Sequence, residues 1–149
     1  MAISQAMCTS FKVELLNGIH AFSTTVARGN TNADSFKLAL YTSSASLGAA
    51  TTDYSSTNEV ANGNGYTTGG NTLVNTGVGL TSTTAFTDFS DTSFTSASFT
   101  ANGCLIYNDT NADRAVCAIA FGSDKTVTSG TFTIQFPTAD ADNAILRIA

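Results

Sequence analysis

Apolar and polar residues alternate in several short segments of the chain, and this two-residue period predicts β-strands. The clearest alternation is in residues 36–42, where Phe36, Leu38 and Leu40 share one face and predict a half-buried strand. Residues 131–136 alternate in the same way, and Pro137 ends that strand because proline has no amide hydrogen to donate. Further strands are expected in residues 72–80, 85–89, 96–100, 103–108, 114–121 and 144–148.

The two most apolar segments, residues 103–108 and 114–121, flank a polar insert and predict a hairpin. Nearly every residue in both segments is apolar, so we expect a central pair that is buried on both faces. With the hairpin tip between residues 110 and 111, Cys104 lies directly opposite Cys117, close enough for a disulfide. We nevertheless expect two reduced, buried thiols, because the N-terminal residues do not resemble a secretory signal.

One short helix is expected near the N-terminus. Apolar residues from Phe11 to Phe22 recur at spacings of three and four, which is the period of one helical face. The Thr9-Ser10 pair can cap a helix that begins at Phe11, and Gly18 can end it. Residues 1–10 are mildly apolar without a predicted element, so we interpret them as a candidate extended arm that reaches a neighbouring subunit.

The spacing of the strands favours an all-β architecture. Nothing between the strands has the length or period of a crossover helix. We therefore predict one mainly β domain over residues 1–149, an antiparallel β-sandwich or jelly-roll-like barrel of about eight strands with one short N-terminal helix. A chain of 149 residues fits a single domain and buries roughly 70% of its unfolded surface.

The composition restricts the possible partners. Charged residues make up only 11% of the chain, less than half the usual ~25%, and the net charge is −5. With six Lys and Arg residues in total there is no basic surface to displace phosphate counterions, so no nucleic-acid binding is expected. No apolar stretch approaches about 18 residues, so no membrane-spanning helix is expected. An uncharged Thr, Ser and Asn surface is easily desolvated, which favours large protein–protein contacts.

Residues 58–73 contain four of the 12 glycines, arranged around Tyr66. A phosphate-binding P-loop would need a lysine after its last glycine, whereas Gly70 is followed by Asn71. We interpret the segment as a loop of fixed shape that forms a contact surface between subunits. Its glycines would supply positive φ angles, and Glu59 would accept hydrogen bonds from its backbone amides. The residues that we assign to this interaction and structural loop are Glu59, Gly65, Tyr66, Gly69 and Gly70.

One acidic segment has a spacing that could suggest a bound ion. Asp109, Asn111 and Asp113 are spaced like the start of a calcium loop. An EF-hand would then need Gly and Glu where Arg114 and Ala120 stand, which excludes that motif. A looser ion site stays open beside the simpler interpretation, a solvated hairpin tip. One His and three dispersed Cys offer no zinc ligand pattern, so no metal and no cofactor are predicted.

No catalytic residues are predicted, and we do not expect an enzyme. His20 is the sole histidine, and a Ser–His–acid triad is not excluded by composition alone. However, the chain has no Gly-x-Ser-x-Gly nucleophile elbow, and a capping or packed histidine is the simpler role. Carbohydrate binding also stays open, with Tyr54 and Tyr66 as the candidate platforms for stacking on sugar rings.

Several segments resemble a group of small tailed-bacteriophage proteins. Residues 36–47 read FKLALYTSSASL, residues 58–60 read NEV and residues 65–73 read GYTTGGNTL. The similarity continues through residues 105–108, 121–125 and 144–148, so it covers most of the chain from Phe11. These proteins are virion structural components. The resemblance implies a phage particle, synthesis in the cytoplasm of a bacterial host, and no catalytic residues.

A small acidic β domain of low charge fits a capsid decoration (cement) protein on the outer capsid surface. Such a protein would form homo-oligomers, with trimers favoured, and would bind the major capsid protein or other virion proteins without contacting nucleic acid or membrane. It would stabilise the shell by binding the assembled lattice better than its free subunits. The alternatives are a tail, neck or fibre component of the virion, and a carbohydrate-binding adhesion module.

Overall fold

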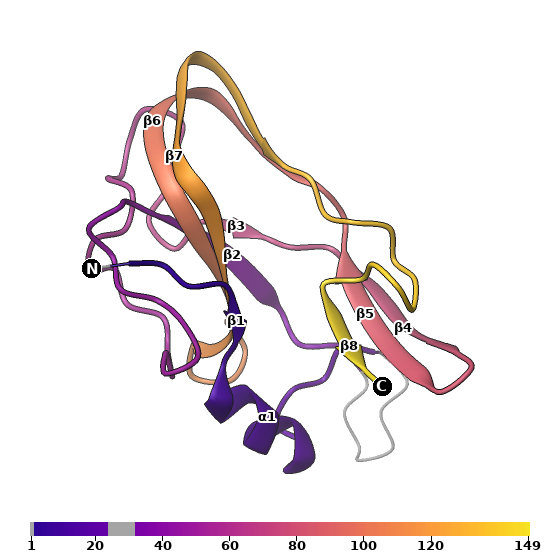
Figure 1. The fold of residues 1–149 in the computed structure, drawn as a ribbon. Helices are drawn as coiled ribbons and strands as arrows, with labels where there is room; N and C mark the ends of the chain where they lie inside the picture. Colours follow the sequence, from indigo (N-terminus) through magenta and orange to yellow (C-terminus); the bar gives the residue numbers. More distant parts are fainter. Residues whose placement is uncertain (1, 24–31) are drawn as a thin grey trace.

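The computed structural model describes residues 2–23 and 32–149, and it forms two antiparallel sheets with one short helix (Figure 1). The elements are β1 (Ala6–Met7), α1 (Thr9–Leu16), β2 (Phe36–Tyr41), β3 (Asn71–Thr72), β4 (Asn75–Thr81), β5 (Thr84–Phe89), β6 (Thr92–Asn108), β7 (Arg114–Ile134) and β8 (Leu146–Ile148). One sheet has the order β1-β7-β6-β2-β3 and the other the order β4-β5-β8. The predicted mainly β class, the antiparallel pairing and the single short helix are confirmed, and the two sheets are consistent with a β-sandwich.

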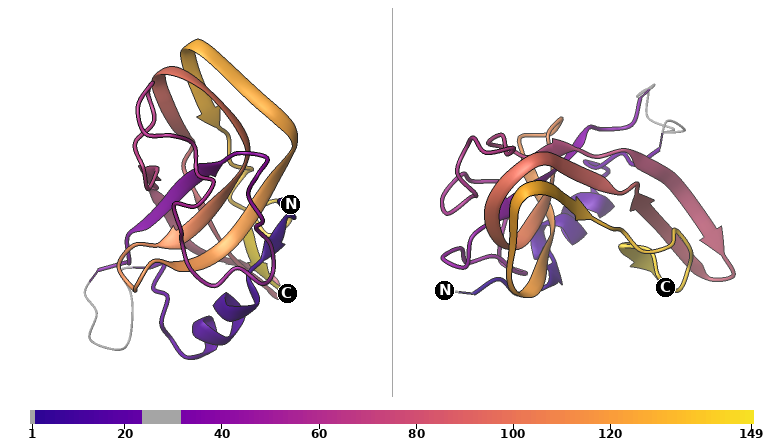
Figure 2. Two further views of the ribbon diagram at one scale, coloured as in Figure 1. Left: turned by 90° about the vertical axis from the view of Figure 1, so that its left-hand side faces the viewer. Right: turned by 90° about the horizontal axis from the view of Figure 1, so that it is seen from above.

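The β6–β7 hairpin dominates the fold. Its strands have 17 and 21 residues, and they arch from the five-stranded sheet toward the three-stranded sheet (Figures 1 and 2). The prediction of separate strands at residues 96–100 and 103–108, and at residues 114–121 and 131–136, is wrong, because β6 and β7 are each continuous. The register shifts at several points, including between Ala101 and Gly103, and such bulges bend a ribbon without ending its pairing.

Strand β2 lies in the interior of the five-stranded sheet, between β6 and β3. The prediction of a half-buried strand is wrong, because Ala39 and Tyr41 on its second face are as buried as Leu38 and Leu40. The reason is tertiary: residues 42–60 return across this strand, and the Tyr41 hydroxyl on its second face donates to Ser55 O over 2.7 Å. The expected burial of the apolar hairpin strands is confirmed for residues 103–108 and 115–118.

The helix begins at Thr9, two residues before the expected start. Its first amides already have partners outside the helix, because Thr9 N donates to Ala49 O over 2.8 Å. The predicted end is confirmed, since α1 ends at Leu16 and Gly18 adopts a φ of 70°. No helix in residues 2–23 and 32–149 has the length and apolarity needed to span a bilayer.

The N-terminal segment lies against its own domain. Residue 1 of the predicted arm is outside the described residues, but Ala6 and Met7 pair with Ala118 and Cys117 of β7. Ser4 N also donates to Leu47 O over 2.8 Å, and the Cys8 side chain is fully buried. Instead of extending away from the domain, residues 2–10 therefore complete the edge of the five-stranded sheet.

The cysteine pairing expected from the hairpin is wrong. Cys104 lies opposite Ile119, and Cys117 lies opposite Ile106. The turn is centred at Asn111, half a residue beyond the assumed position, and a bulge between Ile106 and Tyr107 shifts the register by one more residue. All three cysteines are free, and burial raises the pKa of Cys117 to about 12.

Candidate functional site

The glycine-rich loop is organised around the carboxylate of Glu59. Its Oε1 accepts hydrogen bonds from the Tyr66 hydroxyl (2.5 Å) and from Gly69 N (2.7 Å). Its Oε2 accepts a hydrogen bond from the Tyr54 hydroxyl (2.6 Å). The predicted role of Glu59 as an internal acceptor for a loop amide is therefore confirmed, and the two tyrosine contacts extend it.

Tyr66 fixes this loop to the five-stranded sheet. Its hydroxyl accepts a hydrogen bond from Leu40 N over 2.9 Å, so one oxygen joins β2 to Glu59. Its ring contacts Phe94 and Phe99, with centroids 5.4 and 5.9 Å away. Only 3% of Tyr66 is exposed, so the ring is part of the core and is not a surface platform.

All four tyrosines of the chain surround the loop. Tyr54 stacks on Tyr107 with ring centroids 4.6 Å apart, and the Tyr107 hydroxyl donates to Gly69 O over 2.8 Å. The Tyr41 hydroxyl donates to Ser55 O over 2.7 Å. Burial raises the pKa of each tyrosine above its ordinary value, and the hydrogen bond to Glu59 adds to the effect at Tyr54 and Tyr66. The alternation of β2 and β6 places Tyr41 and Tyr107 in strands, but it does not show that they meet the loop.

Two of the predicted loop glycines lie in close contact with neighbouring backbone. Gly65 has a φ of +82°, and a Cβ there would lie 2.6 Å from Thr95 O. Gly70 has a φ of +73°, and a Cβ there would lie 1.8 Å from Leu38 O. Both positions therefore require glycine for conformation and for space. The loop packs directly on the backbones of β2 and β6.

Replacing Glu59 by Ala is expected to lower the free energy of unfolding by about 3 kcal/mol, because two hydroxyls and one amide lose their shared acceptor. Glu59→Gln keeps one acceptor oxygen and should lose about 1 kcal/mol. Urea denaturation measures both values. Asp124→Ala removes an exposed carboxylate as a control and should change stability by less than about 0.5 kcal/mol. An equally small change in Glu59→Ala would contradict the assigned role.

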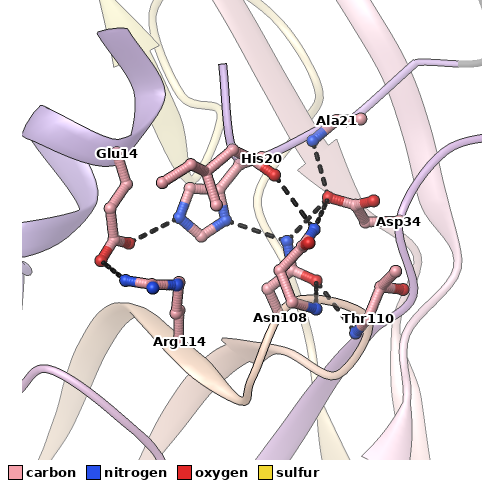
Figure 3. A network of polar contacts seen from close by, with 9 residues as sticks. Glu14, His20, Ala21, Asp34, Asn108, Thr110 and Arg114 are labelled. Atoms are coloured by element: carbon pink, nitrogen blue, oxygen red, sulfur yellow. Dashed lines mark hydrogen bonds and ion pairs between the residues drawn. The ribbon is translucent and has the colours of Figure 1, made fainter. Parts of the chain in front are cut away.

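A second polar network lies at the C-terminal end of β6, where α1 meets the hairpin tip (Figure 3). Glu14 is buried, and its Oε2 lies 2.8 Å from His20 Nε2. Its Oε1 accepts a hydrogen bond from Arg114 Nη1 over 2.7 Å. Burial acts to raise the pKa of Glu14, but the hydrogen bonds from His20 and Arg114 outweigh it and lower that pKa. Glu14 therefore stays ionised and joins the helix to β7.

The side chain of Asn108 orients the His20 ring and selects its tautomer. Its Oδ1 accepts hydrogen bonds from Thr110 N (3.0 Å) and Asn111 N (3.1 Å), so its Nδ2 faces His20 Nδ1 (3.0 Å) and Asp34 Oδ2 (2.8 Å). An amide nitrogen only donates, so His20 Nδ1 accepts and Nε2 carries the proton toward Glu14. With both ring nitrogens engaged and its side chain 0% exposed, His20 is the packed residue that was expected.

The side chains at the hairpin tip that could have suggested an ion site instead bind other residues of the protein. Asn111 Nδ2 donates to Asp34 Oδ2 (2.9 Å) and to Ile19 O (3.0 Å), and Asp109 pairs with Lys37 over 3.0 Å. Among the residues that the structure describes, no three His, Cys, Asp or Glu side chains come together to hold a metal ion. The sequence did not reveal this network, because Glu14, His20 and Asp34 join the tip only through the tertiary fold.

The side chain of Ser10, in α1, is in an unfavourable environment. Its hydroxyl oxygen is buried without a hydrogen-bond partner. Ser10→Ala is expected to raise the free energy of unfolding by about 1 kcal/mol, because it removes a desolvated hydroxyl and favours the helix. Thermal denaturation should show a rise of about 2–4 °C in Tm. Thr9→Ala, at the exposed neighbouring position, is the control for helix propensity alone and should raise Tm by less than Ser10→Ala does. A loss of stability in Ser10→Ala would mean that the hydroxyl is satisfied.

In comparisons with models of protein families, with curated proteins and with solved structures, nothing matched this chain. The two networks are therefore interpreted from their own geometry. Both use their charged and aromatic groups for internal hydrogen bonds, and both fix a loop against the five-stranded sheet. The loops fixed by these hydrogen bonds therefore present a surface whose shape is set before any partner binds.

Proposed function

We propose that this chain is a structural protein of a tailed-bacteriophage particle, a capsid decoration (cement) protein that stabilises the shell through subunit contacts. The observation that carries the proposal is the set of internal hydrogen bonds that hold residues 58–73 against the sheet. The side chains of Glu59 and Tyr66 hold the loop from inside, while residues 61–65, 67 and 68 are exposed and uncharged. A preformed, uncharged loop loses little conformational entropy and little hydration when a partner binds it.

The segments that carry the resemblance to phage proteins also support the proposal, because they meet in space. Residues 36–47 include β2, and residues 58–60 and 65–73 form the loop that docks on it. Val60 and Tyr66 both hydrogen-bond to the backbone of Leu40, and Gly70 packs on the backbone of Leu38. The shared pattern therefore marks one structural unit, the sheet with its contact loop.

The proposed partners are the major capsid protein and other copies of this chain, with a trimer favoured, on the outer surface of a capsid assembled in the bacterial cytoplasm. Occupation of many equivalent sites would stabilise the lattice by mass action. A tail, neck or fibre position is the nearest alternative. The buried ring of Tyr66 and the stacking of Tyr54 on Tyr107 count against the carbohydrate-binding alternative, because neither ring is free as an open platform.

Cryo-electron microscopy of the intact particle tests the proposal. Density for this domain at many positions on the outer shell is the expected result, whereas a few copies at the tail would overturn the decoration role. Binding of the purified protein to undecorated shells tests the loop separately. Ala61→Arg changes the exposed loop surface and should weaken binding, whereas Thr131→Arg, exposed on β7, should bind like the natural chain. Equal binding of both variants would exclude the loop as the contact surface.

A further inference from the structure

One face of the three-stranded sheet is almost entirely apolar. Leu80 of β4 pairs with Ala85 of β5, which pairs with Ile148 of β8, and residues directly opposite in antiparallel strands share a face. The neighbouring row across the same face is Val78, Thr87 and Leu146. We call these six residues, Val78, Leu80, Ala85, Thr87, Leu146 and Ile148, the apolar face.

Three of these six side chains are open to solvent, whereas Thr87 and Leu146 are buried. Leu80 is 72% exposed, and Val78 and Ile148 are each 57% exposed. On the adjoining helix, Leu16 is 91% exposed. Single exposed apolar residues are ordinary, but several on one face indicate a surface that another molecule covers.

A groove separates this face from α1, which lies at the same end of the molecule (Figure 1). Phe11 and Leu15 of the helix, together with Phe22, form the wall opposite the sheet. The groove holds a cavity of about 120 Å³. Apolar cavities of about 150 Å³ admit a molecule the size of benzene, so this one has room for a single aliphatic side chain.

The charge of the residues that line the groove restricts which molecule can bind there. Among residues 2–23 and 32–149, none that lines the groove is charged, and Arg147 of β8 pairs with Phe86 and so lies on the opposite face of the sheet. A charged peptide or ligand would bury its charge here without a counter-charge. Two copies of this chain, each with a net charge of −5, repel each other in general and can meet most favourably through a surface without charge.

We propose that the apolar face binds the apolar face of a second copy of this chain. The same surface carries a projecting aliphatic side chain, Leu80, and a cavity that fits one such side chain, so it is self-complementary, as a two-fold contact between identical copies requires. Such a contact gives a dimer, whereas the trimer favoured on the capsid would need a different, head-to-tail contact. This self-association goes beyond the proposed function because it names a surface, and it holds for the purified chain whether or not a capsid is present.

Sedimentation velocity of the full-length purified chain over a wide concentration range tests the proposal. The natural chain should form a discrete oligomer, and Leu80→Asp and Ile148→Asp should each weaken association by at least about tenfold, because each would bury a carboxylate in the contact. Val74→Asp is the matched control. Val74 is 67% exposed, and its carbonyl accepts a hydrogen bond from Ser90 N, so by alternation it lies on the opposite face to Thr87.

The control variant should associate like the natural chain. Circular dichroism and thermal denaturation verify that each variant is folded. A monomer at every concentration overturns the proposal, and so does an oligomer that Leu80→Asp leaves intact or that Val74→Asp disrupts equally. Because no phage particle enters this experiment, its failure is distinct from failure of the capsid role.

Discussion

Above pH 10 the protein is expected to lose stability steeply, by about 1.4 kcal/mol per pH unit for each buried tyrosine around Glu59. Tyr41, Tyr66 and Tyr107 are 1%, 3% and 2% exposed, and burial is the main cause that raises their pKa above the ordinary value of 10.0. In this range the unfolded chain releases these protons while the folded chain keeps them. The stabilising contribution is therefore fully present below pH 10 and is lost as the pH rises above it.

Together the three tyrosines give a slope of about 4 kcal/mol per pH unit, so a domain of ordinary stability should unfold within about two to three pH units. Urea denaturation at a series of pH values from about 8 to about 12 measures the slope, and tyrosinate absorbance follows the ionisation. Tyr66→Phe should reduce the slope by one tyrosine's share. Gradual ionisation from pH 10 in a chain that stays folded would contradict the expectation.

Gly70→Ala is expected to remove about 4 kcal/mol or more of stability, the largest effect of any single substitution considered for the loop. The new Cβ would lie 1.8 Å from Leu38 O, and the φ of +73° adds strain for any residue with a side chain. The three atoms that a Cβ would meet, Leu38 O, Leu38 C and Ala39 Cα, all belong to the backbone and cannot move aside like the end of a side chain. The loop would have to separate from β2, and its hydrogen bonds to Glu59 would be lost with it.

Substitutions at two other glycines distinguish the cost of the steric clash at Gly70 from the cost of its positive φ angle. Gly63 lies in the same loop with a φ of +106° but has nothing within 4 Å of its Cβ position, so Gly63→Ala should lose only about 1–2 kcal/mol. Gly48 has no positive φ, and its nearest neighbour would be 3.5 Å away, so Gly48→Ala should be close to neutral. Equal losses in Gly70→Ala and Gly63→Ala, measured by urea denaturation, would show that the close approach to β2 carries no cost.

Local features of the fold could be predicted from the sequence. Alternation placed a strand at residues 36–42, and the structure has β2 at Phe36–Tyr41. The glycine pattern and the isolated Glu59 predicted a loop fixed by a carboxylate, and the hydrogen bond from Gly69 bears this out. Both inferences depend on residues that are close together in the chain, where period, turn chemistry and hydrogen-bonding capacity are decisive.

Features that depend on register or on distant contacts could not be predicted. The hairpin pairs Cys104 with Ile119 because of a shifted turn and one bulge, neither of which changes the apolar pattern. Glycines and polar residues within β6 and β7 also led to a prediction of several separate strands. In the structure these positions are bulges within two continuous strands. His20 and Asn108 are 88 positions apart, and no local rule connects them. Likewise, the alternation of β4 gave no sign that Leu80 would remain exposed.

Strands β1 and β2, which are synthesised first, pair with β7 and β6, which are synthesised much later. This pairing restricts the order in which the sheet can form during synthesis. Strand β2 needs residues 103–108, and β1 needs Ala118, so most of the chain must be synthesised before either strand has its partner. Until then the apolar residues 36–41 have no sheet to join. Folding of the five-stranded sheet should therefore begin at the β6–β7 hairpin, whose partners are separated only by its short turn, and cannot finish before β7 has been synthesised.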